Sequence, residues 1–272
     1  MRRFLRRLLK RAGLLEVARE GRDWVTGVRT FRRNLPFWLH GSRDGLPIPP
    51  LRLVRSSTGT SSLEWYFDGG ALAADSIRDT LRRNGVEIGR LESLLDLGCG
   101  CGRVVRQWAT LPGRVHGCDY NPRVVAWCRR QLPFARFEVN ALTPPLPYDR
   151  EQFDLVYALS VFTHLPEPLL APWMQELARV LRPGGFLILT THGESYLDEL
   201  TPEEQREFHA ARPVVRYEAD AGTNRCGVYC SEQFVRERLA TGFRVIDYVP
   251  QGARGNPRQD LTLLQRSPSF GT

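Results

Sequence analysis

An apolar stretch, a glycine-rich turn and a second apolar stretch follow one another at residues 94–105, and this arrangement constrains the fold most. The stretch reads LLDLGCGCGRVV, which predicts a buried strand, a tight turn and a helix. Glycine lets the backbone turn sharply and approach a ligand where a Cβ would clash. Because cofactors bind at the turns that follow the strands of such sheets, we expect a binding site here. The turn residues of this site are Gly98, Cys99, Gly100 and Gly102.

Short apolar runs alternate with helical stretches from residue 93 onward. Such alternation is typical of a parallel sheet that is covered by helices on both faces. The last two predicted strands are joined by a short loop rich in glycine and proline, so we expect them to pair antiparallel. The predicted strands are 93–98, 114–119, 135–139, 153–159, 185–191, 243–249 and 260–265. The predicted helices are 71–84, 102–110, 122–131, 168–181 and 231–240.

Three segments stand apart from this alternation. Residues 1–40 are basic and are predicted to be an amphipathic helical segment. Residues 41–70 are predicted to be a connector and lid, without a helix in 41–62, because glycine, proline, serine and threonine interrupt any periodicity there. Residues 71–272 form the predicted main domain, in which residues 194–230 break the alternation and are interpreted as an insertion.

The positive charge of the chain lies at its N-terminus. The net charge of the 272 residues is +8, and residues 1–40 alone hold eleven basic and three acidic side chains. The remainder is therefore neutral, which does not favour nucleic-acid binding by the main domain. No apolar run approaches the roughly 18 residues of a spanning helix. The six cysteines form no C-x-x-C pair, so we expect no metal site.

The first residues have the pattern of a basic amphipathic helix. At 100° per residue, the apolar side chains of residues 2–12 fall on one arc and the basic ones on the other. This pattern favours peripheral contact of residues 1–33 with an anionic membrane. Two alternatives stay open: the apolar stripe packs on the domain or on a partner, or the segment is a transit peptide. We expect a cytoplasmic protein, with the inner face of the membrane as a second location.

Three polar residues lie within or at the ends of the first three predicted strands. Asp96 lies two residues before Gly98, where a carboxylate suits an amino group or a cation better than a pyrophosphate. Asp119 lies 21 residues after Gly98, the spacing at which a carboxylate reaches two ribose hydroxyls. The amide of Asn140 can pair with an adenine edge, or it can satisfy the backbone of its own turn. Arg103 replaces the third glycine of the dinucleotide motif G-x-G-x-x-G, which disfavours NAD.

These residues resemble the class I S-adenosylmethionine-dependent methyltransferases. The resemblance covers about residues 70–265, and its four segments occur in order at the expected intervals. The matching segments are LDLGCGCG at 95–102, Asp119, FDLVYA with SVFTHL at 153–165, and LARVLRPGG at 177–185.

The resemblance implies a Rossmann-like three-layer α/β fold with a seven-stranded, mostly parallel sheet and an antiparallel last strand. It also implies S-adenosylmethionine as the cofactor. Asp96 would lie near the cofactor's amino group, Asp119 would bind the ribose hydroxyls, and Ser160 would lie near the methyl group. The full set of implied cofactor-binding residues is Asp96, Gly98, Cys99, Gly100, Gly102, Asp119, Tyr120, Asn140, Ala141, Ser160, Tyr66 and Gly70.

Methyl transfer is an in-line displacement, which needs alignment more than acid–base chemistry. An oxygen acceptor with a high pKa still gains from a general base. Two histidines stand where such a base would act: His164 after the fourth predicted strand and His192 after the fifth, with Glu194 beside the second. We therefore name His192, His164 and Glu194 as catalytic candidates. The alternative for His164 is a histidine that caps the backbone at the start of a turn or helix.

The resemblance implies that residues 194–230 and 41–66 select the acceptor. Aromatic and arginine side chains in the insertion suit a sugar, a phosphate-bearing acceptor or an acidic small molecule; alternatively, they only pack the insertion. We predict methyl transfer to an oxygen of a small molecule or glycan, in glycan or secondary-metabolite biosynthesis. The alternatives are an RNA or protein methyltransferase and an inactive scaffold that binds the cofactor. The sequence does not indicate an oligomeric state.

Overall fold

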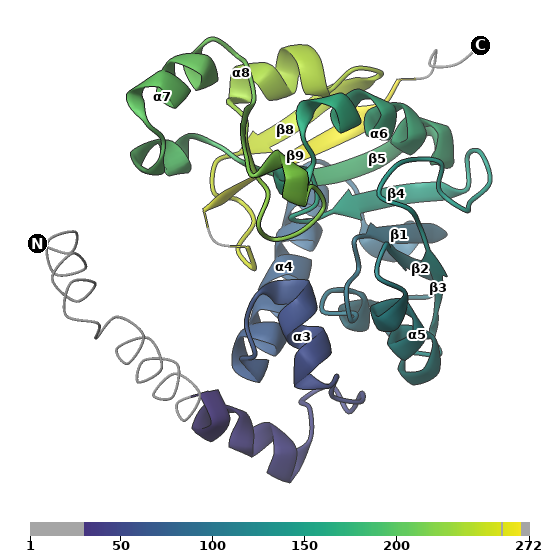
Figure 1. Cartoon of the computed structure of the whole chain (residues 1–272). Helices are drawn as coiled ribbons and strands as arrows, with labels where there is room; N and C mark the ends of the chain where they lie inside the picture. The colour runs from purple at the N-terminus through teal and green to yellow at the C-terminus, as the bar shows by residue number, and fades with distance from the viewer. Residues whose placement is uncertain (1–29, 257, 268–272) are drawn as a thin grey trace, which may run out of the picture.

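The structure is a computed structural model that describes residues 30–256 and 258–267 (Figure 1). The amphipathic helix predicted for residues 2–12 therefore lies outside the described residues. Residues 30–40 are helical and precede the main domain. In the part of the chain that is described, no helix is both long enough and apolar enough to cross a membrane.

A central sheet organises the molecule. Its parallel strands lie in the order β3–β2–β1–β4–β5, and β9 pairs antiparallel with both β5 and β8. The predicted mostly parallel sheet and the antiparallel pairing of the last two strands are thus confirmed. These strands are β1 (Ser93–Leu97), β2 (Arg114–Asp119), β3 (Ala135–Val139), β4 (Phe153–Ala158), β5 (Leu181–His192), β8 (Phe243–Val249) and β9 (Gln259–Arg266).

The sheet has nine described strands, two more than the seven predicted. The insertion supplies both: β6 (Val214–Arg216) and β7 (Gly227–Tyr229) form an antiparallel pair. β7 joins the sheet through a single pairing, His192 with Tyr229, at the end of β5. Sequence periodicity could not indicate strands this short, because three residues contain barely one alternation. The rest of the insertion consists of η4 (Glu194–Glu199), α7 (Pro202–His209) and η5 (Glu218–Asp220).

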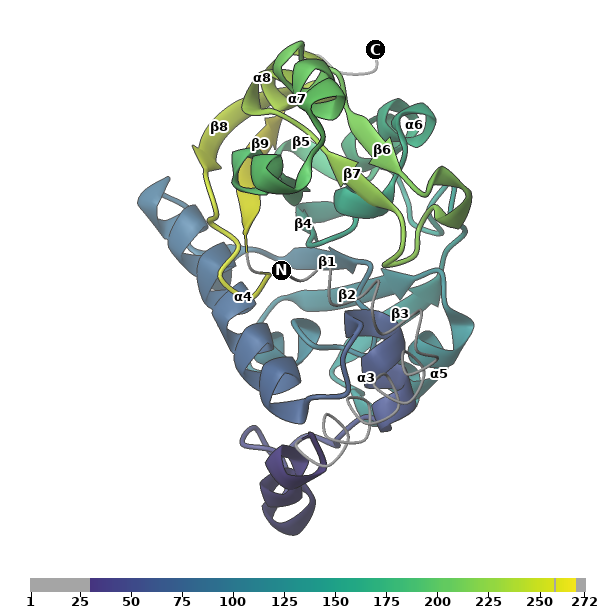
Figure 2. The ribbon, with the colours of Figure 1, turned by 60° about the vertical axis from the view of Figure 1, so that its left-hand side comes forward.

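Alternate side chains of the strands enter two separate cores, one on each face of the sheet. Leu94 of β1 belongs to the core beneath α3, α4 and α5, whereas its neighbour Leu95 belongs to the core beneath α6. This alternation follows from the two-residue period of a strand. The helices are α3 (Leu51–Thr58), α4 (Leu63–Arg83), α5 (Pro122–Gln131) and α6 (Glu167–Val180). Figure 2 shows α4 as a long rod beside the sheet.

Two predicted boundaries near the N-terminus are wrong. Residues 41–62 contain α3, which buries Leu53 and Val54 and ends at Gly59 in the left-handed conformation. α4 begins at Leu63 rather than at residue 71, because the Ser62 side chain accepts a hydrogen bond from the Trp65 N–H, 3.2 Å away, and caps the helix. Both helices are stabilised by packing that local composition does not reveal.

Two other predicted helices differ from the structure. Residues 102–110 form turns and the 3₁₀ helix η2 (Val105–Trp108) instead of a regular helix. Residues 231–240 form the short helix α8 (Glu232–Phe234) followed by a π-helical turn, η6 (Val235–Leu239). The sequence pattern located both segments correctly but not their hydrogen bonding.

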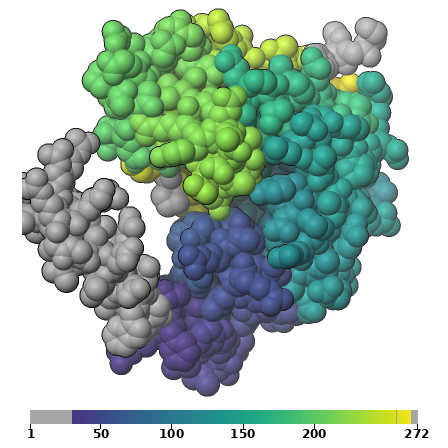
Figure 3. All heavy atoms as spheres, in the orientation of Figure 1, coloured from purple at the N-terminus to yellow at the C-terminus, as the bar shows by residue number. Residues whose placement is uncertain are grey.

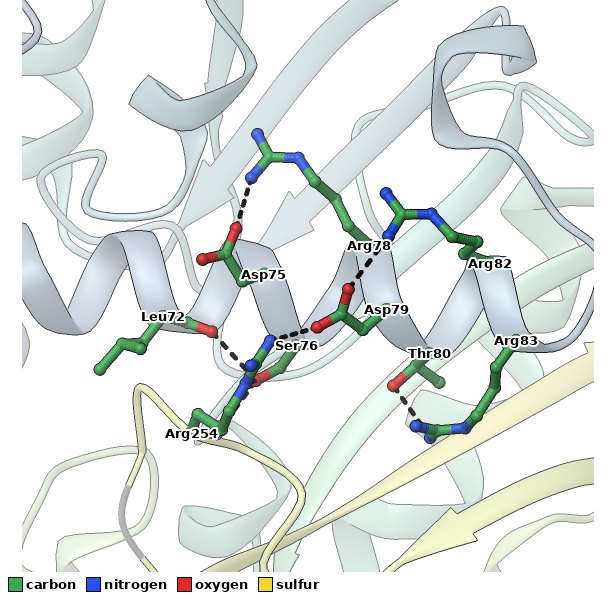
Figure 4. Close-up of polar contacts among 9 residues, drawn as sticks. All are labelled: Leu72, Asp75, Ser76, Arg78, Asp79, Thr80, Arg82, Arg83 and Arg254. Atoms are coloured by element: carbon green, nitrogen blue, oxygen red, sulfur yellow. Dashed lines mark hydrogen bonds and ion pairs between the residues drawn. The ribbon is translucent and has the colours of Figure 1, made fainter.

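The loop that joins β8 to β9 contacts one side of α4 (Figure 4). Arg254 of this loop donates to Ser76 Oγ (3.2 Å) and to Asp79 Oδ2 (2.6 Å). The loop also lies directly on the helix: a Cβ on Gly255 would overlap the carbonyl oxygen of Gly69. This attachment positions the next residue, Asn256, beside the glycine-rich turn, as described below.

Candidate functional site

A cavity of about 230 Å³ opens at the carboxyl ends of β1, β2 and β4. Its floor is the glycine-rich turn, and two segments far apart in the sequence close over it: the end of α3 and residues 222–224 of the insertion. In Figure 3 the yellow-green surface of the insertion lies directly above the blue surface of α3. The predicted site residues in the wall are Asp96, Gly98, Cys99, Gly100, Asp119, Tyr120, Asn140, Ala141, Ser160 and His164.

The turn is held by close contacts that only glycine permits. Gly98, Gly100 and Gly102 all have positive φ, at 77°, 52° and 82°. A Cβ on Gly98 would lie 2.5 Å from Val161 Cγ2, and one on Gly102 would overlap the Leu132 side chain. Gly102 therefore packs against the end of α5 rather than lining the cavity.

Asp119 is fixed in place by the turn itself. Its two carboxylate oxygens accept hydrogen bonds from the backbone N–H groups of Gly100 (2.9 Å) and Asn121 (2.8 Å). Burial raises the pKa of Asp119, and these two hydrogen bonds oppose the rise. Since each oxygen has a second lone pair, the carboxylate can still accept from a bound ligand.

Asp96 is a buried carboxyl group at the other side of the turn. Burial raises its pKa to about 8, while a hydrogen bond from Tyr157 and the nearby Arg103 guanidinium act in the opposite direction. Trp108 Nε1 in turn donates to the Tyr157 hydroxyl (2.8 Å), so a chain of hydrogen bonds leads from the core to Asp96. A cationic ligand group in the cavity would favour the ionised form of Asp96.

Asn140 presents an unused acceptor. Its Nδ2 donates to the carbonyl oxygen of Ala141 (2.7 Å), whereas its buried Oδ1 has no hydrogen-bond partner among the described residues. A buried polar atom without a partner costs free energy, so the site is suited to a ligand that donates there. The prediction that Asn140 bonds its own turn and the prediction that it meets a ligand are thus compatible.

Tyr66 and Gly70 do not line the cavity. The Tyr66 hydroxyl is fully buried and donates to the carbonyl oxygen of Cys101 (2.7 Å). Gly70 lets α4 approach the turn, since a Cβ there would overlap the carbonyl oxygen of Arg103. The neighbouring Trp65 is the α4 side chain in the wall instead. The sequence could not distinguish these residues, because the predicted helix began after them.

Arg103 is a wall residue that the sequence reasoning missed. It donates to the carbonyl oxygen of Gly255 (3.0 Å) and to Asn256 Oδ1 (2.7 Å), and its guanidinium lies 4.9 Å from the centre of the Trp65 ring. Its position directly after the last glycine of the turn was the available signal. The sequence reasoning also missed Leu142, Trp173 and Asn256. The segments predicted to select the acceptor supply the wall residues Ser56, Ser57, Thr58, Gly222, Thr223 and Asn224.

The two candidate histidines occupy different environments. His164, in η3 (Phe162–His164), lines the cavity, and its Nδ1 lies 2.6 Å from the carbonyl oxygen of Cys226. Because a carbonyl can only accept, Nδ1 carries the proton and Nε2 keeps its lone pair. Burial lowers the pKa of His164, which keeps the ring neutral near pH 7.

His192 lies outside the cavity wall. Its ring packs 4.4 Å from that of Tyr196, 5.1 Å from that of Tyr229 and 6.3 Å from that of His164. Burial, with His164 and Arg258 nearby, lowers the pKa of His192 to about 4. Glu194, the first residue of η4, is exposed and also lies outside the wall. The structure therefore brings only His164 of the three catalytic candidates to the cavity.

The insertion has a small core of its own. Leu200, Phe208, Val214 and Tyr229 are buried together. Its arginines are paired with nearby carboxylates: Arg216 with Glu204, Arg212 with Glu207 and Arg225 with Asp220. Phe208 and Tyr229 pack the insertion, whereas Arg212, Arg225 and Tyr217 lie on its surface, and only the tip at 222–224 reaches the cavity.

Comparisons with known proteins agree with this geometry. Residues 95–189 match the family model described as "Methyltransferase domain". The chain is 35% identical over 111 residues to a malonyl-[acyl-carrier protein] O-methyltransferase of Enterobacter lignolyticus, covering 41% of this chain and 43% of the relative. It is 30% identical over 168 residues to a tRNA U34 carboxymethyltransferase of Cellvibrio japonicus, covering 58% and 43%. The match thus spans less than half the length of either relative.

The fold is also that of solved structures. An S-adenosylmethionine-dependent methyltransferase from Mesorhizobium loti superimposes with a TM-score of 0.50 at 19% identity, over 71% of this chain and 100% of the other. In the part of the chain that is described, no group of three or more histidine, cysteine or acidic residues could hold a metal ion.

Proposed function

The chain belongs to the class I S-adenosylmethionine-dependent methyltransferases, and on this premise we propose that it methylates an oxygen atom of a neutral small molecule or glycan. The observation that supports this proposal best is the placement of His164. It lines the cavity with Nδ1 held by the Cys226 carbonyl, which leaves Nε2 as a base.

The residues present fit the family's cofactor, S-adenosylmethionine. Asp96 would hold its amino group, Asp119 its ribose hydroxyls, and the unpartnered Oδ1 of Asn140 would accept from the amino group of its adenine. The cofactor supplies a methyl carbon that its sulfonium activates for displacement. The remaining predicted cofactor contacts of the wall, Gly98, Cys99, Gly100, Tyr120, Ala141 and Ser160, surround these three groups.

His164 would then act on the acceptor. Its Nε2 would take the proton of the acceptor hydroxyl, which leaves the acceptor oxygen as the nucleophile for the methyl group that the bound cofactor would supply. The lowered pKa of His164 keeps Nε2 unprotonated at neutral pH, which this role requires. His192, packed behind it among tyrosines, would position the ring of His164 rather than touch the acceptor.

The wall around the cavity favours an uncharged, hydroxylated acceptor. Serine and threonine side chains at the end of α3, four asparagines and two tryptophans line it. Arg103 is the arginine of this wall, and it already donates to Gly255 and Asn256, so it is poorly placed to bind a phosphate. Tryptophan faces suit sugar rings and apolar rings.

Two other acceptor classes follow from the relatives' names: a carrier-bound acid and a tRNA. Both acceptors carry negative charge. A wall that holds the carboxyl groups of Asp96 and Asp119, and whose Arg103 already bonds Gly255 and Asn256, does not favour them. The inactive-scaffold alternative predicts cofactor binding without turnover. We further infer a cytoplasmic location with peripheral membrane contact through residues 1–33, a proposal based on their charge pattern.

The decisive experiment uses cofactor that carries a labelled methyl group. The full chain is incubated with separated small-molecule, glycan, lipid, protein and RNA fractions of the source cell. We expect label in the small-molecule or glycan fraction and a loss of at least about 100-fold in rate for His164→Gln, with unchanged cofactor affinity. The matched control is His209→Gln, because His209 is exposed on α7.

Label in the RNA or protein fraction would contradict the proposed acceptor. Cofactor binding without label in any fraction would favour the scaffold. An undiminished rate for His164→Gln would show that the displacement needs no base at this position.

A further inference from the structure

The helix of residues 30–40 has two faces with different neighbours. One face is anchored: Asn34 accepts from the Leu63 N–H (2.8 Å) and donates to the Ser61 carbonyl oxygen (2.9 Å), and Phe37 stacks on Phe67 at 4.9 Å. These contacts fix the helix on the start of α4. Figures 1 and 2 show it, in dark purple, at the periphery of the molecule.

The other face is apolar and exposed. Phe31, Leu35, Trp38 and Leu39, here called the apolar stripe, are 56%, 39%, 42% and 67% exposed. Their spacing of three and four residues places them on one side of a helix. The rings of Phe31 and Trp38 lie 5.1 Å apart, so the stripe is continuous rather than scattered. Contiguous exposed apolar side chains of this kind indicate an interaction surface.

Most charged side chains near the apolar stripe are positive, although Arg33 lies 4.0 Å from the carboxylate of Glu64 on α4. Arg32 and Arg33 are exposed on the same helix. Nine further basic residues, with three acidic ones, lie in residues 1–29, which connect directly to it. Aromatic and leucine side chains beside arginines suit the boundary between the headgroups and acyl chains of an anionic bilayer, since the stems of arginine pack on apolar groups while the guanidinium contacts phosphate.

We propose that the apolar stripe docks the protein on the surface of an anionic lipid bilayer. The stripe enters the headgroup boundary, and the basic residues before it contribute electrostatic attraction that falls with salt. This surface is distinct from the pattern of residues 2–12, and it does not depend on the identity of the methyl acceptor. A second copy of the chain and the chain's own residues 2–12 are the competing occupants of the stripe.

The first test is flotation of the full chain with vesicles of phosphatidylcholine, with or without about 30% phosphatidylserine. We expect flotation with the anionic vesicles only. The triple variant Phe31→Gln, Leu35→Gln, Leu39→Gln should lower binding at least about tenfold, because glutamine keeps helix propensity and removes the apolar surface. The control is Leu72→Gln, since Leu72 is 43% exposed on α4, away from the stripe.

Equal binding by the triple variant and the wild type would overturn the proposal and assign the contact to residues 1–29 alone. No flotation of the wild type with either vesicle would overturn it as well. If the triple variant does not fold, Leu39→Gln is used alone, because Leu39 is the most exposed residue of the stripe and its replacement disturbs packing least. That variant should lower binding about threefold.

The second test reads the environment of the stripe directly. A polarity-sensitive fluorophore is attached to the thiol of a Leu39→Cys variant. The six native cysteines are buried, so the reagent reacts with the introduced thiol. We expect emission typical of water without lipid and a blue shift on anionic vesicles. A blue shift already present without lipid would overturn the proposal: if it depends on concentration, a second copy covers the stripe, and otherwise the chain's own N-terminal residues do.

Discussion

The floor of the cavity and the insertion that closes over it are built in contrasting ways. The floor is fixed by backbone: glycines in left-handed conformations pack against Val161 and Leu132, and backbone N–H groups hold both oxygens of Asp119. The insertion has its own core and its own ion pairs, and it joins the sheet by one pairing at Tyr229.

The two regions meet at His164. Its Nδ1 contacts the carbonyl oxygen of Cys226, and its own carbonyl oxygen accepts from the N–H of Gly222, 2.8 Å away. The insertion therefore positions the proposed base while the floor positions the cofactor. Substitutions in the insertion can therefore change which acceptor is selected, whereas the glycine-rich floor tolerates few substitutions.

The largest effect on stability is expected from a substitution in the β8–β9 loop, which contacts the glycine-rich turn at the floor of the cavity. Gly255→Ala would place a Cβ on the Gly69 carbonyl oxygen and on Ala73, and it would move Asn256 away from Arg103. We expect a loss of about 3 kcal/mol in the free energy of unfolding, measured by urea denaturation. The control Gly89→Ala has open space at its Cβ and should change stability by less than about 0.5 kcal/mol. Equal free energies of unfolding for Gly255→Ala and the wild type would show that the β8–β9 loop can move away from α4 at little cost.

A smaller effect should follow from removing the charge of Asp119. Asp119→Asn keeps one of the two acceptors of the turn, places an NH2 group against the other backbone N–H, and loses the charge-assisted hydrogen bonds to the ribose hydroxyls. We expect cofactor affinity to fall by about 2 kcal/mol, roughly 30-fold, in calorimetric titration. Asp149→Asn, at an exposed position, is the matched control. Unchanged affinity for Asp119→Asn would place the ribose elsewhere.

The sequence predicted the floor far better than its surroundings. Strand β1, the glycines of the turn and Asp119 were recognisable because they form one motif with characteristic spacing, although the turn also packs on the distant Val161 and Leu132. Arg103 was visible in the same motif, but its partners Gly255 and Asn256 lie more than 150 residues away. Its role could therefore not be derived from spacing.

The helical face of α4 and the choice between the two histidines needed three-dimensional information. The sequence did not show that α4 begins after a cap at Ser62, so nothing indicated that Trp65 rather than Tyr66 would face the cavity. His164 and His192 both follow strands, and only the tertiary structure shows that one lines the cavity while the other packs among tyrosines. Local patterns cannot encode which of two equivalent strand ends the insertion will cover.

The floor and the insertion can also be compared by how the stability of the protein depends on pH. Burial lowers the pKa of His116, in β2 under the floor, and of His192, beside the insertion, to about 4 each. The unfolded chain protonates these rings near pH 6.5, so their contribution to stability is present above pH 6.5 and is lost as the pH falls toward 4. We expect each ring to lower the free energy of unfolding by about 1–2 kcal/mol between pH 7 and pH 5.

The measurement is urea denaturation at several pH values. His192→Gln and His116→Gln should each remove a similar part of the pH dependence, whatever their effect at pH 7. If only His116→Gln flattens the profile, the His192 ring is accessible to solvent, and the junction between insertion and sheet is looser than its packing indicates.

The smallest effect is expected in the insertion itself. Arg212 pairs with Glu207 in the same segment and both side chains are exposed, so Arg212→Gln should shift the thermal midpoint by no more than about 1 °C. It should also leave kcat/KM unchanged for the acceptor that the labelling experiment identifies, because the paired guanidinium lies outside the cavity wall. Asn224→Ala, at the tip that lines the cavity, should raise KM for the same acceptor. A loss of kcat/KM in Arg212→Gln would instead mean that the arginines of the insertion leave their carboxylates to bind the acceptor. The acceptor would then contact the insertion along its whole length and not only at the tip that lines the cavity.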